Sequence, residues 1–253
     1  MKFTRYISTH HAFSTSDLLS AMDAPNSAED QLRRAVRAGS VERVRRGLLV
    51  SNFGRYEDEP IDPASVVMAA DPMAVLSYHS ALEYYGVAHN VGFVCRFRSD
   101  VMKSPFSFRG IDYEPHGPAA NVKAKEMMGG SGGRRITTRE QTLVDCLEKP
   151  SLAGGVEELL RGVSAFSYLD LRELLELVES SSASTVSRVG WLLEEKAEDW
   201  HVEEDLLSRL ESRLGRGPYR LGHPRTGKSG WSARWRLLLP EENDEVEKWI
   251  SRS

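Results

Sequence analysis

The sequence predicts a mixed α/β (α+β) fold, in which a small N-terminal domain of helices and a hairpin precedes a larger mixed α/β domain with a helical C-terminal half. Apolar residues recur at helical spacing near the N-terminus, and a charged hairpin pattern follows at 41–50. The polar stretch 51–63 contains two prolines and predicts a domain boundary. From residue 155 onward, amphipathic helical patterns dominate.

The composition is that of a globular protein. The 253 residues are 40% hydrophobic and 28% charged, which suits two packed domains and excludes a disordered chain. No stretch approaches the roughly 18 consecutive apolar residues of a membrane helix, and the N-terminus lacks the apolar run of a signal peptide. We therefore expect a cytoplasmic protein. Cys95 and Cys146 lie in apolar runs and are expected to be reduced core residues.

Charge is distributed unevenly along the chain. The net charge is −4, yet residues 1–50 hold eight Lys and Arg against five Asp and Glu, so this segment is +3 and the remainder is −7. A surface that attracts an anionic partner is therefore expected in the N-terminal domain.

The N-terminal domain, residues 1–55, is expected to begin with two short helices. Residues 2–11 predict the first helix. The second, over 15–22, follows Ser14 and Asp17, which have the spacing of a capping box.

A third helix is predicted over 28–38. Ser27 and Asp30 repeat the capping-box spacing, and Gly39 is a typical residue after a helix end. At 100° per residue the apolar side chains gather on one face and the charged ones on the other. The apolar face contains Ala28, Leu32, Ala35 and Val36, and the opposite face contains Ser27, Asp30, Arg34 and Arg37, with Arg33 on its flank.

Residues 41–50 predict a hairpin with a turn at Arg46 and Gly47. Two short helices, a basic third helix and a hairpin occur in the order of a winged helix-turn-helix, which binds double-stranded DNA with the third helix in the major groove. Arginine suits this task because it pairs with phosphates and with guanine edges. The expected DNA-binding residues are Ser27, Gln31, Arg33, Arg34, Arg37, Arg43, Arg45 and Arg46. Glu29 and Asp30, in the expected first turn of the helix, favour the helix dipole but repel phosphate. The alternatives are that they accept from cytosine N4 or that the helix enters the groove by its middle.

The second domain is expected over 63–240, with an acidic C-terminal tail at 241–253. Its first half predicts helices at 64–70 and 77–85, and a candidate hairpin of strands 92–98 and 106–114. Thr137 or Thr138 is expected to cap a further helix that runs through Leu147. Further helices are predicted at 155–163, 169–179, 184–196 and 202–214, and a last hairpin pairs 219–221 with 232–239.

Two motifs near the end of this domain each have two possible interpretations. Gly222–Ser229 satisfies the GxxxxGK[ST] pattern, but it contains Pro224 and precedes a strand pattern, whereas a phosphate-binding loop opens a helix. We interpret it as the tip of the last hairpin. A second basic patch interleaved with aromatic residues is one candidate function for that hairpin, and core tryptophans with arginines on an edge strand are the other. The patch would contain Arg220, Arg225, Lys228, Arg234 and Arg236.

No pattern indicates catalysis. The seven histidines lack metal-ligand spacing, and no GxSxG nucleophile motif occurs. We expect a protein that is not an enzyme and needs no metal or cofactor.

Five segments form an ordered set between about 13 and 238: the hairpin segment 41–50, the helical segment Leu76-Ser-Tyr-His-Ser-Ala-Leu-Glu-Tyr-Tyr-Gly-Val, Thr138–Asp145, Arg188–Glu194 and the final Trp235-Arg-Leu. In this order they resemble segments of AbiEi-type antitoxins. The hairpin segment 41–50 resembles the family's wing, and the segment that begins at Leu76 resembles a characteristic helix of the family.

This resemblance implies an antitoxin of a bacterial toxin-antitoxin system, a phage-defence type, that acts as a transcriptional repressor of its own operon. It would bind inverted repeats in its own promoter and oppose a cognate nucleotidyltransferase-like toxin, directly or indirectly. A protein-binding module that inhibits the toxin directly, a plain winged-helix regulator, and an ATP-using enzyme built on Gly222–Ser229 are the alternatives.

Overall fold

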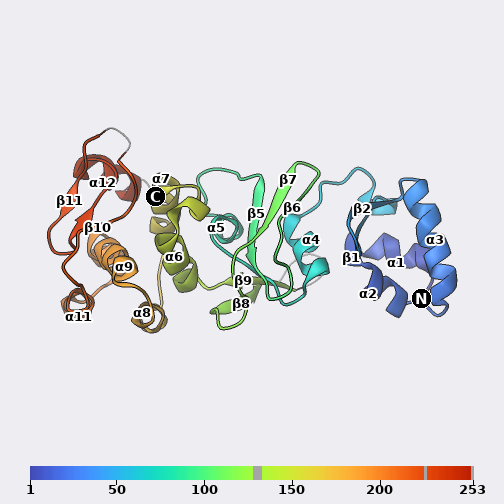
Figure 1. The fold of residues 1–253 in the computed structure, drawn as a ribbon, viewed down its shortest axis with the longest axis horizontal. Helices are drawn as coiled ribbons and strands as arrows, with labels where there is room; N and C mark the ends of the chain where they lie inside the picture. The colour runs from blue at the N-terminus through green and yellow to red at the C-terminus, as the bar shows by residue number, and fades with distance from the viewer. Residues whose placement is uncertain (128–132, 225–226, 252–253) are drawn as a thin grey trace. The chain divides into compact units, whose positions relative to one another are not determined.

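The computed structural model describes residues 1–127, 133–224 and 227–251 and shows a mixed α+β fold (Figure 1). Two compact units are present. The first comprises 1–76, 93–121 and 125–136, and the second comprises 77–92, 122–124 and 137–253. None of the helices in the described residues is long and apolar enough to span a membrane. The boundary predicted at 51–63 is untested and stays a prediction.

The first unit begins with helices around a small sheet (Figure 1). Its elements are α1 (Phe3–Thr9), β1 (Ala12–Ser14), α2 (Thr15–Ser20), α3 (Pro25–Arg37), β2 (Val41–Arg45) and β3 (Leu48–Ser51). The strands lie in the order β1-β3-β2, and both pairs are antiparallel. A core that includes Tyr6, Phe13, Leu18 and Leu49 joins α1 and α2 to the sheet.

The two capping-box predictions had different outcomes. Ser14 accepts a hydrogen bond from the backbone N–H of Asp17, so the first is confirmed. The second is wrong, because α3 begins two residues before Ser27, at Pro25. Proline is favoured at a first helical position, where its missing N–H costs nothing. Glu29 and Asp30 therefore lie in α3 after its first turn, and the first turn itself contains no acidic residue.

The rest of the first unit is built on a six-stranded sheet in the order β6-β7-β5-β4-β9-β8. Its strands are β4 (Val75–Leu76), β5 (Val94–Arg98), β6 (Phe106–Phe108), β7 (Ile111–Pro115), β8 (Ala124–Met127) and β9 (Arg134–Thr137). Two further elements are η1 (Gly54–Tyr56) and α4 (Pro63–Ala70), whose N-cap Asp62 accepts from the backbone of Ala64.

The hairpin expected between 92–98 and 106–114 is wrong in its pairing. The segment 106–114 folds back on itself at Arg109 and Gly110, which both have positive φ and form the turn between antiparallel β6 and β7. The chain then pairs β7 parallel to β5. The Arg-Gly pair inside the run was the signal for this turn.

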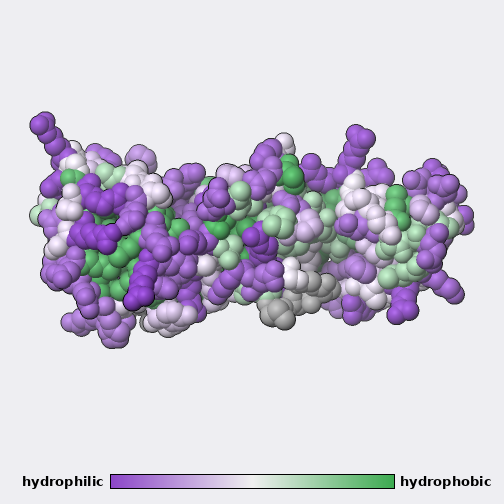
Figure 2. All heavy atoms as spheres, turned by 90° about the horizontal axis from the view of Figure 1, so that it is seen from below, coloured by the Kyte–Doolittle hydropathy of each residue, from purple (hydrophilic) through white to green (hydrophobic). Residues whose placement is uncertain are grey.

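The second unit is mainly helical, as expected. Its elements are α5 (His79–Tyr85), α6 (Arg139–Glu148), η2 (Pro150–Ala153), α7 (Val156–Ser164), α8 (Leu171–Glu179), α9 (Ala183–Glu195), α10 (Ala197–Trp200), α11 (Glu204–Glu211) and α12 (Asn243–Ser251), with strands β10 (Tyr219–Arg220), β11 (Trp231–Ser232) and β12 (Leu237–Leu238). One core contains residues from α5 to α12. In the view of Figure 2, hydrophilic residues cover much of the surface and hydrophobic residues show between them.

Two C-terminal expectations fail. The segments 219–221 and 232–239 do not form an antiparallel hairpin, since β10 lies parallel to β12 and β11 pairs with β12 from the other side. The segment expected as an acidic tail contains α12. Val246, Trp249 and Ile250 have helical spacing and are buried, so their apolar surface outweighs the acidic composition of the segment.

Candidate nucleic-acid interface

The exposed face of α3 is the first half of the candidate site. Ala28 is buried, and Leu32, Ala35 and Val36 pack against the same core, as the helical spacing predicts. Arg34 and Arg37 are exposed on the other side, as are Ser27 and Asp30. Gln31 is half-buried and donates to the Ser27 hydroxyl over 3.1 Å.

Arg33 and Asp30 form an ion pair one helical turn apart. The hydrogen bond and charge of Arg33 lower the pKa of the Asp30 carboxyl, and the same contact raises the pKa of Arg33. Asp30 therefore stays ionised at neutral pH, and its charge is compensated within α3. Arg33 is correspondingly less available to a phosphate than Arg34 or Arg37.

The β2-β3 hairpin, here called the wing (residues 41–51), is the second half of the candidate site. It turns at Arg46 and Gly47, where Gly47 has a φ of 82°. Its register shifts between Arg43, which lies opposite Leu49, and Arg45, which lies opposite Leu48. Because successive residues of β3 point to opposite faces, this bulge places Arg43 and Arg45 on opposite faces of the wing.

The register also assigns each face. Arg43 shares its face with Leu49, which belongs to the core under the helices, so Arg43 is on the helix side. Arg45 shares the opposite face with Glu42, whose partner Val50 is two residues from Leu48. There the Arg45 guanidinium lies over the Phe106 ring, 5.2 Å from its centroid, and Glu42 pairs with Arg109.

Four arginines of the site are exposed and unengaged among the residues that the structure describes. Within the described residues no ion pair or side-chain hydrogen bond engages Arg34, Arg37, Arg43 or Arg46, and all four are exposed. Their donors are therefore available to an external ligand. A guanidinium offers five N–H groups in a planar fork, which matches phosphate oxygens and the guanine edge.

The second basic patch predicted near the C-terminus consists largely of engaged residues. Arg225 lies outside the described residues, and Lys228 forms an exposed pair with Glu242 over 3.0 Å. Arg236 donates to the backbone carbonyls of Leu214 and Gly215. Arg220 is exposed.

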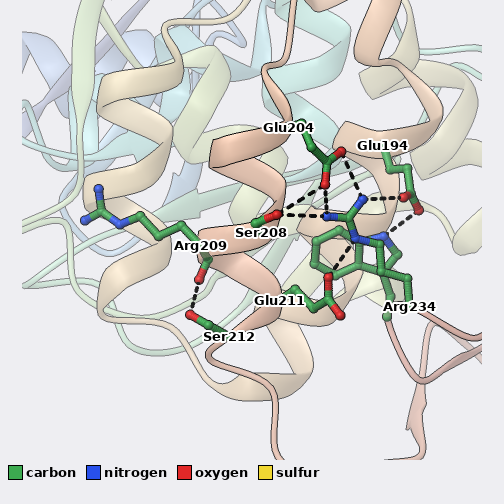
Figure 3. Close-up of polar contacts among 8 residues, drawn as sticks. Glu194, Glu204, Ser208, Arg209, Glu211, Ser212 and Arg234 are labelled. Atoms are coloured by element: carbon green, nitrogen blue, oxygen red, sulfur yellow. Dashed lines mark hydrogen bonds and ion pairs between the residues drawn. The ribbon is translucent and has the colours of Figure 1, made fainter.

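Arg234 is the most heavily engaged arginine of that patch. It pairs with Glu194 over 3.0 Å, Glu204 over 2.5 Å and Glu211 over 2.9 Å, and these contacts raise its pKa further. Figure 3 shows its guanidinium enclosed by these three carboxylates, whereas Arg209 points away from them. The contacts tie the β11-β12 connection to α9 and α11, so Arg234 has a structural role.

The tryptophans flanking this cluster differ. Trp235 is fully buried, and its ring N–H donates to Glu194 over 2.7 Å. A Cβ added at Gly190 would overlap the Trp235 ring, so α9 needs a glycine at that position. Trp231 is 45% exposed. For Trp235 the core interpretation is confirmed.

The GxxxxGK[ST] segment does not open a helix. After Lys228 and Ser229 the chain continues into β11, and residues 225–226 lie outside the described residues. Cys95 and Cys146 are buried, as expected of core residues. Among the described residues, no group of three or more His, Cys, Asp or Glu side chains is arranged to hold a metal ion.

A buried polar cluster in the second unit escaped the sequence patterns. Glu158 accepts from the backbone N–H groups of His89 and Asn90 over 2.8 and 3.0 Å, and from a ring nitrogen of His79 over 3.2 Å. The cluster fastens the 89–90 loop to α7. Its members come from three separate segments, so no local spacing could have indicated it.

No protein-family model and no curated protein sequence matches the chain. Among solved structures, the RV2827C protein from Mycobacterium tuberculosis has a similar fold, with a TM-score of 0.66. The match covers 96% of this chain and 90% of that chain at 16% sequence identity. At this identity the likeness concerns the fold, and it extends over nearly the whole length of both chains.

Proposed function

We propose that this chain is a sequence-specific DNA-binding protein whose N-terminal elements act as a winged helix-turn-helix. The proposal rests on four exposed arginines of α3 and the wing that form no ion pair or side-chain hydrogen bond within the described residues. In this arrangement Arg34 and Arg37 enter the major groove with α3. Arg43, on the helix side of the wing, and Arg46, at its turn, contact the adjacent backbone.

The acidic residue on α3 is compatible with this function. Asp30 would repel phosphate, but its pairing with Arg33 compensates the charge before DNA arrives. The first turn of α3 contains no acidic residue, so the positive end of the helix dipole, at its N-terminus, also favours DNA phosphate.

The test is fluorescence anisotropy with the duplex just upstream of this protein's gene and a shuffled duplex, over a salt series. Four to six phosphate contacts give a slope of log K against log salt of roughly −4 to −5. The Arg34→Ala/Arg37→Ala variant is expected to lose the preference for the upstream duplex. The matched control is Arg172→Ala/Arg216→Ala, which removes the same charge from exposed sites in the second unit. Equal binding of both duplexes by the wild type would contradict the proposal.

The antitoxin function is a second proposal and is supported by the AbiEi resemblance. The segments that carry the resemblance in α5, α6 and α9 contribute Leu82, Leu143 and Val189 to one core. They are thus parts of one folded body, which would be the element that opposes a nucleotidyltransferase-like toxin. The chain would then repress its own operon through α3 and the wing.

Co-expression with the neighbouring gene product tests this proposal. If neutralisation requires only the second unit, the Arg34→Ala/Arg37→Ala variant rescues growth as well as the wild type while losing repression of a promoter reporter. Failure of the wild type to rescue growth would contradict the antitoxin function and leave a plain regulator. Loss of rescue in the variant alone would place the neutralising surface on the N-terminal elements, as in the protein-binding alternative.

A further inference from the structure

The turn between β6 and β7 contacts the wing on the face opposite Arg43. Arg109 donates to both carboxylate oxygens of Glu42, over 3.2 Å in one of the two bonds. It also donates to the backbone carbonyl of Glu59 over 3.5 Å. This fork-to-carboxylate geometry fixes orientation as well as distance. The side chains of Arg109 and Glu42 are 29% and 37% exposed, so the pair is partly shielded from water.

A second contact joins the same two hairpins. Phe106 of β6 lies under the Arg45 guanidinium and stacks on Tyr113 of β7, with ring centroids 4.6 Å apart. Tyr113 is fully buried, so the ring stack extends from the core of the sheet to the wing. A ring that faces a guanidinium engages the plane of the cation and leaves its N–H edge free.

The bulge in β2 makes both contacts possible at once. Glu42 and Arg45 are three residues apart in sequence, so in a regular strand their side chains would point to opposite faces. The shift between Arg43 and Arg45 brings them to one face, where Arg109 and Phe106 lie.

We propose that the β6-β7 hairpin is a brace for the wing, in which Arg109 and Phe106 are positioning residues for DNA binding. The inference rests on the proposed DNA-binding function. Arg109 fixes the wing through Glu42 and cancels the only acidic charge of residues 41–46. Phe106 orients Arg45 while its donors stay available to a backbone phosphate. Neither positioning residue itself contacts DNA.

The experiment uses the full chain and a charge exchange. Arg109→Glu places two carboxylates together and is expected to weaken binding to the upstream duplex by about fivefold, while the exchanged pair Glu42→Arg/Arg109→Glu restores the affinity to within about twofold of wild type. Arg209→Glu is the matched control, because it breaks the exposed Arg209 pair with Glu179 and changes the net charge equally. Its affinity is expected to stay at the wild-type value.

Two results would overturn the brace. If the exchanged pair is as weak as Arg109→Glu, Arg109 acts through DNA or the fold and not through Glu42. If Arg109→Glu binds like Arg209→Glu, the contact has no role in binding. Phe106→Leu is expected to weaken binding by about twofold and to lower the unfolding temperature slightly, because it releases Arg45 and removes the stack on Tyr113.

Hydrogen exchange of the wing amides, residues 41–51, separates failure of the brace from failure of the proposed function. Arg109→Glu is expected to accelerate this exchange, and the exchanged pair is expected to restore it. If the wild type shows no preference for the upstream duplex but exchange follows this pattern, the DNA-binding proposal fails and the brace stands. Exchange that is identical in wild type and Arg109→Glu overturns the brace whatever the DNA result.

Discussion

Arginines of the N-terminal elements and arginines of the second unit have different surroundings. Arg34, Arg37, Arg43 and Arg46 project from α3 and the wing with no internal ion-pair partner among the described residues. In the second unit Arg234 is enclosed by three carboxylates. The role of an arginine is thus set by the acceptors that the fold brings to it, which local basic composition does not reveal.

The second unit also uses arginine at helix ends. Arg188 donates to the carbonyls of Leu147 and Glu148 at the end of α6, and Arg213 donates to those of Val178 and Glu179 at the end of α8. The last carbonyls of a helix have no partner within it, so a cation there satisfies acceptors and complements the helix dipole. These arginines stabilise the fold and are unavailable to nucleic acid.

The largest expected effect is on the core behind the Arg234 cluster. Gly190→Ala forces a methyl group into the Trp235 ring and is expected to reduce the free energy of unfolding by about 3 kcal/mol or more. Urea denaturation followed by tryptophan fluorescence measures this change. The control Ala183→Gly, at the first residue of α9, is expected to cost no more than about 1 kcal/mol. An unchanged midpoint for Gly190→Ala would contradict the packing described for Trp235.

Arg234→Ala is expected to reduce the free energy of unfolding by about 1 kcal/mol, because it leaves three carboxylates close together without their cation, while water screens their repulsion. DNA affinity should not change, since Arg234 is structural. A variant that unfolded like wild type but lost DNA binding would contradict the structural role of Arg234. Urea denaturation and anisotropy on the same preparation decide between these results.

Asp30→Asn tests how the acidic charge on the exposed face of α3 affects DNA affinity. The substitution removes a negative charge from the exposed face of α3 and releases Arg33, so affinity for any duplex is expected to rise by about threefold. The matched control is Asp170→Asn in the second unit, at the N-cap of α8, which should leave DNA affinity unchanged. A fall in affinity for Asp30→Asn, measured by anisotropy, would indicate that Asp30 itself accepts from a base.

A smaller effect is expected from His11. Its ring stacks on Tyr56 with centroids 4.4 Å apart, and its Nε2 is buried without a hydrogen-bond partner among the described residues. Burial and, secondarily, the charge of Arg109 lower its pKa, although Glu59 and Asp62 act in the opposite direction and Arg55 in the same one.

The pH dependence follows from that direction. Neutral His11 is favoured in the native state, so its contribution to the free energy of unfolding is fully present above the unfolded-state pKa of about 6.5. As pH falls from there toward the lower native pKa, the unfolded chain binds a proton at His11 that the native chain does not, and this contribution is lost. His11→Phe keeps the stacked ring and removes the titration. Its unfolding temperature should fall less than that of wild type between pH 7.5 and pH 5. Parallel curves for the two proteins would contradict the assignment.

Local patterns predicted what depends on local structure. The apolar and charged faces of α3, the wing turn at Gly47 and the cap at Ser14 follow from spacing along one element. The i,i+3 spacing of Asp30 and Arg33 on one helix is also sufficient to predict their ion pair. The capping-box spacing of Ser27 predicts too late a start for α3, because Pro25 occupies the first helical position.

Contacts between distant segments were not predictable in this way. The acceptors of Arg234 lie 23 to 40 residues away in sequence, and those of Arg188 lie 32 to 41 residues away. The pairing of Arg109 with Glu42 spans 67 residues and depends on a two-residue turn inside an apparent strand. The parallel pairings of β5 with β7 and β10 with β12 likewise depend on tertiary packing.

We propose that Arg34, Arg37, Arg43 and Arg46 of α3 and the wing bind DNA, and that Arg234, which three carboxylates engage, does not. The salt dependence of binding to the upstream duplex tests it most directly, in wild type, in the quadruple variant Arg34→Ala/Arg37→Ala/Arg43→Ala/Arg46→Ala and in Arg234→Ala. The slope should become less steep by about 0.9 for each phosphate that the quadruple variant no longer neutralises, and it should stay unchanged in Arg234→Ala. A quadruple variant with the wild-type slope, or an equal flattening of the slope in Arg234→Ala, would contradict the claim.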